Sequence, residues 1–84
     1  MGEVAVVLKV MPEDAETDLE RIDDAIRDSI EVEDLQHEEV AFGLKALKVS
    51  TIVSDDEGGT DTVENSVSGI DGVRSVEVED MQRL

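Results

Sequence analysis

Two stretches of the chain alternate between apolar and other side chains with a period of two, which is typical of strands that bury one face. In residues 3–11 the side chains that share one face are Val4, Val6, Leu8 and Val10. In residues 45–54 the side chains that share one face are Leu47, Val49, Thr51 and Val53. Pro12 follows the first stretch and, because proline has no backbone donor, it predicts the end of that strand.

Two other stretches repeat apolar residues at spacings of three and four, which predicts helices with one apolar side. The first carries Leu19, Ile22, Ile26 and Ile30, and the second carries Val63, Val67 and Ile70. Thr17 and Glu20 have the spacing of a capping box, so Thr17 is the expected N-cap of the first helix. Thr60 or Asp61 is the expected N-cap of the second. A solvated face is expected for the charged residues opposite the first apolar stripe, which are Asp23, Asp24, Arg27 and Asp28.

The remaining segments predict a loop and two less regular strands. Residues 32–39 are acidic and weakly patterned, which predicts a loop leading into a strand that runs to about Phe42. Residues 73–81 predict the last strand, with Val76 and Val78 facing the core. Phe42 is the only aromatic residue, and Gly43 follows it as a bend. The pattern leaves two interpretations of Phe42 open: core filling in a central hairpin, or an exposed side chain presented to a partner.

The predicted order of elements is strand, helix, strand, strand, helix, strand. In this order each helix can connect two parallel strands with one strand between them, as in the split βαβ units of ferredoxin-like domains. The expected fold class is therefore α+β, a ferredoxin-like βαββαβ sandwich in which a four-stranded antiparallel sheet carries two helices on one face. The other face of the sheet is left open, and such a face is a natural place to meet another protein.

Length and composition predict one domain over residues 1–84 with an acidic surface. The chain has 23 Asp and Glu against 7 Lys and Arg, a net charge of −16 and no Cys. The sequence therefore offers no disulfide and no thiolate metal site, and no apolar run reaches the ~18 residues of a membrane helix. Because acids repel phosphates and anionic lipid, we expect neither direct nucleic-acid binding nor membrane binding. This composition resembles that of proteins from salt-accumulating halophiles, in which molar salt screens the repulsion.

The residue types of an active site do not form a recognisable motif. There is no Cys, and no serine has a basic partner in the pattern, so nucleophilic catalysis is not indicated. His37 has no second ligand candidate at a helical or strand spacing, so no metal site is expected. Residues 55–61 read D-D-E-G-G-T-D, without the ligand spacing of a calcium loop or the Lys-Ser or Lys-Thr of a phosphate-binding loop. We expect no catalytic residues.

One block of the sequence resembles a known family. Residues 40–49 read V-A-F-G-L-K-A-L-K-V, which is similar to the I-A-F-G-L-K-A-L block of archaeal translation elongation factor 1-beta. Other segments that resemble the family are residues 2–4 with 10–12, residues 56–61 with 63–64, and residues 70–73 with 75–78. The resemblance covers essentially the whole chain.

This resemblance implies a ferredoxin-like guanine nucleotide exchange factor that acts in the cytoplasm on elongation factor 1-alpha during translation elongation. Such a factor binds the G protein in its GDP-bound and nucleotide-free states and destabilises the Mg-GDP site, without a cofactor of its own and without covalent chemistry. The partner-binding residues that the resemblance implies are Phe42, Gly43, Lys45, Arg83 and Leu84. Arg83 stands where related factors carry a Lys that reaches toward the magnesium site, and Ala46 stands where the eukaryotic block has a second Lys.

Two other function classes fit the same order of elements. A regulatory domain that senses small molecules at a dimer interface needs a glycine-rich loop between the first strand and the first helix, and residues 12–14 do not supply one. That class is kept as the alternative. Acylphosphatase-like catalysis needs an anion-binding Arg near the first loop, and the nearest one, Arg21, falls inside the predicted helix. We therefore discard it.

Overall fold

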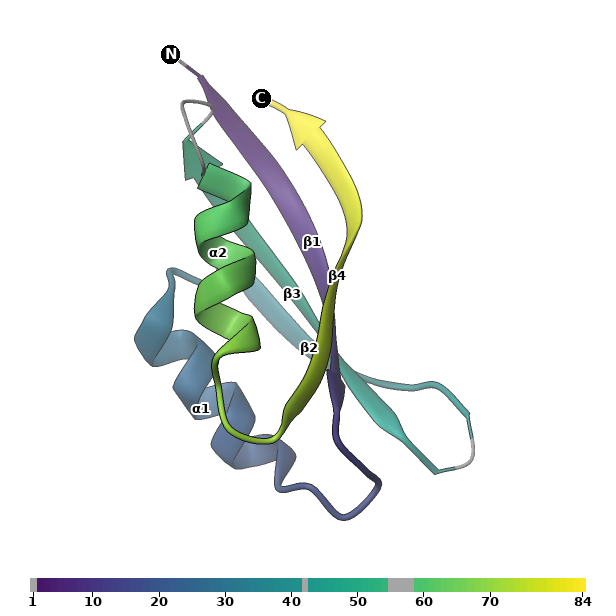
Figure 1. Cartoon of the computed structure of the whole chain (residues 1–84). Helices are drawn as coiled ribbons and strands as arrows, with labels where there is room; N and C mark the ends of the chain where they lie inside the picture. The colour runs from purple at the N-terminus through teal and green to yellow at the C-terminus, as the bar shows by residue number, and fades with distance from the viewer. Residues whose placement is uncertain (1, 42, 55–58) are drawn as a thin grey trace.

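The computed structural model describes residues 2–41, 43–54 and 59–84. The strands are β1 (Glu3–Pro12), β2 (Asp34–Glu39), β3 (Lys45–Ser54) and β4 (Val73–Arg83). The helices are α1 (Leu19–Ser29) and α2 (Gly59–Ser68). Along the chain the order is β1, α1, β2, β3, α2, β4 (Figure 1), as the hydrophobic pattern predicts.

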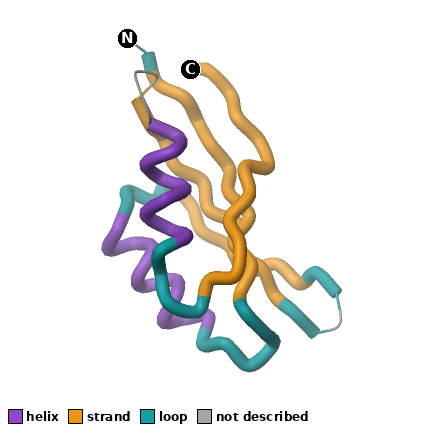
Figure 2. The backbone as a smooth tube through the Cα atoms, viewed as in Figure 1, coloured by secondary structure: helices purple, strands orange, loops and turns teal. Residues whose placement is uncertain are grey.

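The four strands form one antiparallel sheet in the order β2-β3-β1-β4. Both helices lie on the same side of this sheet (Figure 2), so one face is covered and the other is open. The predicted α+β ferredoxin-like fold is confirmed. The molecule is elongated along the strands, with extents of 41 × 20 × 17 Å.

The core lies between the covered face of the sheet and the two helices. The alternating residues of β1 and β3 are buried as predicted. Apolar residues that lie directly opposite each other on the two strands, such as Leu8 and Val49, both point to this face. The buried residues contributed by the helices are Ile22, Ile26, Val63 and Val67. The one polar side chain among the buried residues that the structure describes is Thr51, whose hydroxyl donates a hydrogen bond to the carbonyl oxygen of Glu31. This bond offsets the cost of burying the hydroxyl.

The starts of both helices differ from the predictions. The N-cap of α1 is Asp18, not Thr17, since the Asp18 Oδ1 accepts hydrogen bonds from the backbone N–H groups of Glu20 and Arg21 at 3.1 and 3.2 Å. The Thr17 hydroxyl is used one turn earlier, where it donates to Asp14 Oδ1 and accepts from the Asp14 N–H. Thr17 and Asp18 are adjacent residues that can both cap a helix. Because the Thr17 hydroxyl is hydrogen-bonded to Asp14 in the loop, Asp18 caps α1.

The second helix begins at Gly59, so Thr60 and Asp61 lie inside its first turn rather than at the cap. A Cβ atom at position 59 would collide with the backbone oxygen of Ser54 at the end of β3. Glycine is therefore required here because the start of α2 passes directly against the strand.

The edge strands also differ from the predictions in extent. Residues 34–39 were expected to be a loop, but they form β2, an edge strand in which only Leu35 is partly buried. Because β2 buries only one side chain, its sequence shows no alternation of apolar and polar residues, and the strand could not be predicted from such a pattern. The last strand, predicted over 73–81, continues to Arg83. Its Val76 and Val78 are half-buried and pack against the core, as predicted.

Candidate functional site

The residues predicted to bind a partner lie at two opposite ends of the sheet. Gly43 and Lys45 lie at the β2–β3 hairpin, and Arg83 and Leu84 lie where the two chain termini meet (Figure 1). Arg83 is opposite Val4 in the β1–β4 ladder. The hairpin adjoins the other end of β1, about eight residues further along, so the two ends are roughly 26 Å apart at ~3.3 Å per residue. Phe42, the fifth predicted residue, lies outside the described residues.

The hairpin end is closed by a tight turn. The N–H of Leu44 donates to the carbonyl oxygen of Ala41 at 2.9 Å, and the N–H of Val40 donates to that of Leu44 at 3.0 Å. Gly43 has a φ of 78°, which non-glycine residues rarely adopt, so the bend predicted at Gly43 is confirmed. Lys45 follows as the exposed first residue of β3, opposite Glu39.

A surface pocket of about 470 Å³ lies beside this hairpin. Its lining comes from two parts of the chain that are distant in the sequence: the stretch from Pro12 at the end of β1 to Glu20 at the start of α1, and the β2–β3 hairpin with His37, Gly43 and Lys45. The wall formed by the loop and helix carries carboxylates of Asp14, Asp18 and Glu20. Nothing in the sequence pattern predicts a part for Asp14, Asp18 or Glu20 in a partner-binding site. The signal that could have found them is the fold itself, because β1 pairs antiparallel with β3 and so ends beside the hairpin.

The loops around this pocket are fixed by contacts between distant segments. Arg21 Nη2 donates to the carbonyl oxygen of Asp71 at 3.0 Å, and the N–H of Glu13 donates to that of Gly72 at 2.9 Å. Gly72 has a φ of 98°, and a Cβ there would lie 3.0 to 3.3 Å from side-chain atoms of Arg21, Thr17 and Ile22. The α2–β4 turn and the β1–α1 loop are thus packed against each other.

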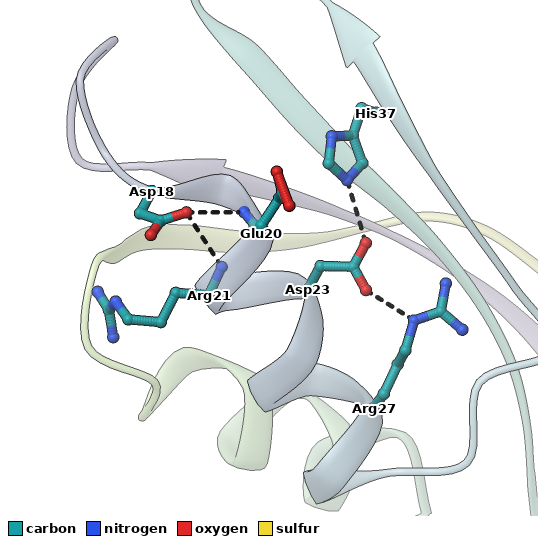
Figure 3. Close-up of polar contacts among 6 residues, drawn as sticks. All are labelled: Asp18, Glu20, Arg21, Asp23, Arg27 and His37. Atoms are coloured by element: carbon teal, nitrogen blue, oxygen red, sulfur yellow. Dashed lines mark hydrogen bonds and ion pairs between the residues drawn. The ribbon is translucent and has the colours of Figure 1, made fainter.

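The charged side of α1 does more than face solvent. His37 Nε2 lies 3.1 Å from Asp23 Oδ2, and Arg27 Nε donates to Asp23 Oδ1 at 2.6 Å (Figure 3). Burial of the Asp23 carboxyl raises its pKa, but the hydrogen bonds and positive charges of Arg27 and His37 outweigh burial and hold that pKa below its ordinary value. This cluster connects α1 to β2 through Asp23, so the prediction of a purely solvated face is wrong for Asp23, while Arg27 is exposed as predicted.

The termini end is held by the sheet ladder. The N–H of Leu84 donates to the carbonyl oxygen of Glu3 at 2.9 Å, which continues the β1–β4 pairing past Arg83. Arg83 and Leu84 are nevertheless exposed, and 67% of the Leu84 surface is accessible. This end is therefore an ordered, accessible surface.

The structure places the predicted residues that it describes in two pairs, Gly43 with Lys45 and Arg83 with Leu84. The two pairs lie at opposite ends of the sheet. Within the described residues no group of His, Asp and Glu side chains could hold a metal ion. Over the same ranges, no helix has the length and apolar character to cross a membrane. The predicted residues that the structure describes thus lie in two separate exposed regions at opposite ends of one sheet.

Comparison with known proteins identifies the family. The profile of the EF-1 guanine nucleotide exchange domain matches residues 5–84. The chain belongs to this family. Its curated relatives named elongation factor 1-beta include those of Methanothermobacter thermautotrophicus, at 46% identity over 100% of this chain and 99% of the relative, and of the halophile Natronomonas pharaonis, at 44% over 100% of both. The relative from Halobacterium salinarum, another halophile, is also 44% identical over 100% of both chains.

Family membership assigns the chain a role in guanine nucleotide exchange during translation elongation. It confirms the family predicted from the block at residues 40–49 and is consistent with the halophilic character of the composition. The partner-binding roles of Phe42, Gly43, Lys45, Arg83 and Leu84 stay predictions.

Proposed function

We propose that this chain, acting over residues 1–84 as one exchange domain in the cytoplasm, binds elongation factor 1-alpha in its GDP-bound and nucleotide-free states. It promotes replacement of GDP by GTP by destabilising the Mg-GDP site of that G protein, with no cofactor and no covalent step. The observation that supports this proposal most is the family match over residues 5–84 together with the exposure of Lys45 and Arg83 at the two ends of the sheet.

Exchange of this kind follows from thermodynamic coupling. GDP is held on a G protein largely through Mg²⁺ and through groups around its phosphates. A factor that binds the nucleotide-free state more tightly than the GDP state must lower the affinity for GDP by the same coupling free energy. The chain therefore needs only contacts that fit the nucleotide-free state better.

The two ends of the sheet divide this task in our proposal. At the hairpin end, Phe42, Gly43 and Lys45 anchor the chain on the partner. At the termini end, the Arg83 guanidinium approaches the magnesium site as a positive charge, or pairs with a carboxylate that is released when the metal leaves. The sheet between them is a rigid spacer of roughly 26 Å.

The test is stopped-flow release of labelled GDP from elongation factor 1-alpha at molar KCl, with and without the chain in excess. We expect the wild-type chain to accelerate release. Phe42→Ala should lose this acceleration while keeping the circular dichroism and melting temperature of the wild type, since an interface anchor contributes to binding more than to folding. If Phe42 is instead core filling, Phe42→Ala should unfold the chain or cost ~3–5 kcal/mol. GDP release that is unchanged by the wild-type chain would rule out exchange and favour the small-molecule-sensing alternative.

A further inference from the structure

The open face of the sheet carries a strip without acidic residues along its two central strands. The strip consists of the outward-facing side chains between the two ends of these strands: Ala5, Val7, Lys9 and Met11 from β1, and Lys48, Ser50 and Ile52 from β3. We call these seven residues the central strip. Glu3, at the exposed start of β1, lies on the same face and bounds the strip at the termini end. In a chain with 23 acids, a strip of this length with none is a local exception.

Lys9 and Lys48 lie directly opposite each other in the β1–β3 ladder. They are two of the three lysines in the chain. Residues directly opposite in an antiparallel pair have Cβ atoms ~5 Å apart, and like charges placed there destabilise the sheet. The register therefore holds two positive charges side by side.

Neither ammonium has a partner within the part of the chain that the structure describes. The ion pairs and side-chain hydrogen bonds there involve other residues. Glu77 of β4 is opposite Lys9 on its other side, yet its carboxylate does not form an ion pair with Lys9. The repulsion between the two ammonium groups is thus not relieved by a direct ion pair within the described residues, although the Glu77 charge on the next strand reduces it through space.

Acidic residues border the strip on both edge strands. On β2 they are Asp34 and Glu38, and on β4 they are Glu77 and Asp80. The central strip is therefore a narrow cationic and apolar band between two negative edges. A second copy of the chain laid strip against strip would bring two lysine pairs together, which electrostatics disfavours.

We propose that the central strip is a docking surface for elongation factor 1-alpha, which contributes a carboxylate that lies between Lys9 and Lys48. The apolar residues of the strip, Val7, Met11 and Ile52 among them, cover the surroundings of that carboxylate. A carboxylate has two oxygens and can accept a charge-assisted hydrogen bond from each ammonium. This inference rests on the proposed function, because it takes the same G protein as the occupant.

The position of the strip supports this choice of occupant. A partner that contacts both ends of the sheet must pass over about 26 Å of surface between them. The covered face is occupied by α1 and α2, so the open face is the direct path. The central strip runs along that path, from Ala5 near the termini end to Met11 near the hairpin end.

The test compares the wild-type chain with Lys9→Gln/Lys48→Gln in binding to nucleotide-free elongation factor 1-alpha, measured by titration, and in GDP release. The control is Arg74→Gln, which also removes a positive charge, from an exposed position of β4 outside the strip. We expect the double variant to lose at least tenfold in affinity and the control less than twofold. The double variant should also melt at the same temperature as the wild type or higher, because a like-charge contact is removed. A purely structural role would lower the melting temperature instead.

Each outcome separates this proposal from the proposed function. If the wild type accelerates GDP release and the double variant binds equally well, the docking surface is wrong and the exchange function stands. If the wild type binds without accelerating release and the double variant binds weakly, the docking surface stands and the exchange function fails. No binding by the wild type overturns both. Sedimentation that shows a wild-type dimer, dissociated by the double variant, makes a second copy the occupant and overturns the proposal.

Discussion

The hairpin end and the termini end of the sheet are built in different ways. The hairpin end brings the stretch from Pro12 to Glu20 beside the β2–β3 hairpin, and contacts such as that of Arg21 with Asp71 hold the start of α1 against the α2–β4 turn. The termini end is a continuation of the β1–β4 ladder, closed by the bond from Leu84 to Glu3. Substitutions in the packed turns of the hairpin end should therefore change the stability of the fold, whereas substitutions at the termini end should change surface chemistry and leave the fold intact.

The largest effect is expected for Gly72→Ala, which strains the turn that packs against the β1–α1 loop. Its φ of 98° and the neighbours at 3.0 to 3.3 Å predict a loss of about 2 kcal/mol in the free energy of unfolding. Gly69→Ala is the matched control, because a Cβ there meets only backbone oxygens at 3.5 Å or more. The measurement is urea unfolding of the three chains. Equal midpoints for Gly72→Ala and the wild type would contradict the idea of a tightly packed hairpin end.

At the termini end, deletion of Arg83 and Leu84 should leave the fold and partner binding largely intact. It removes the Leu84–Glu3 hydrogen bond, the terminal Val4–Arg83 pair of the β1–β4 ladder and two exposed side chains. GDP release should slow at least tenfold, about 1.4 kcal/mol in the barrier. Arg83→Lys should retain most of the activity and Arg83→Glu very little, since the proposed role needs a positive charge. Full-speed release by the truncated chain, measured by stopped flow, would remove Arg83 from the exchange site.

A double-mutant cycle sharpens the comparison between the ends. Lys45→Gln should weaken binding of elongation factor 1-alpha about fivefold, roughly 1 kcal/mol, because it removes an exposed charge at the hairpin end. Arg83→Gln should leave binding almost unchanged, so the double variant should bind within ~0.5 kcal/mol of Lys45→Gln alone, as expected of sites far beyond ~10 Å. Titration of the single and double variants measures this. A larger coupling would mean that the two ends do not act as separate contacts.

The smallest effect is expected for Asp23→Asn, in the cluster that connects α1 to β2. The folded pKa of Asp23 is lowered, so its charge contributes stability that is present above the ordinary pKa of ~3.9 and is lost as the pH falls through the folded pKa. At neutral pH the variant should lose roughly 0.5 kcal/mol. In urea unfolding, the difference from the wild type should shrink as the pH falls below the ordinary Asp pKa of ~3.9. A difference that does not change as the pH is lowered would exclude the charge as its cause.

Most of the fold could be predicted because the central strands alternate without interruption. Each of Val6, Leu8, Leu47 and Val49 is at most 1% exposed, and a register shift by one residue would turn all of them to solvent. The edge strands were harder, because β2 has a single half-buried residue and the last residues of β4 carry no apolar alternation. A strand that buries one face shows apolar alternation in its sequence. A strand held at the sheet edge mainly by backbone hydrogen bonds shows little of it.

The candidate site could be predicted only in part. The bend at Gly43 follows from local chain chemistry, since a positive φ favours glycine. The pocket could not be predicted from local pattern, because Asp14, Glu20 and Lys45 come together only when β1 pairs with β3. The N-cap could not be chosen between Thr17 and Asp18 from the sequence. The Thr17 hydroxyl is hydrogen-bonded within the loop to Asp14, which leaves the Asp18 carboxylate to cap the helix.

The place of β1 in the sheet has a consequence for how the chain folds as it is synthesised. β1 is made first, yet its two neighbours are β3 and β4, and the β1–β4 ladder joins Val4 to Arg83. The ribosome must therefore complete β4 before β1 has both partners, and until then one edge of an apolar strand stays unpaired. Pairings between such distant segments form slowly, because the entropy lost on closing a long loop comes before the contacts that stabilise the pair. Folding of this domain is accordingly expected to finish only after its last strand has left the ribosome.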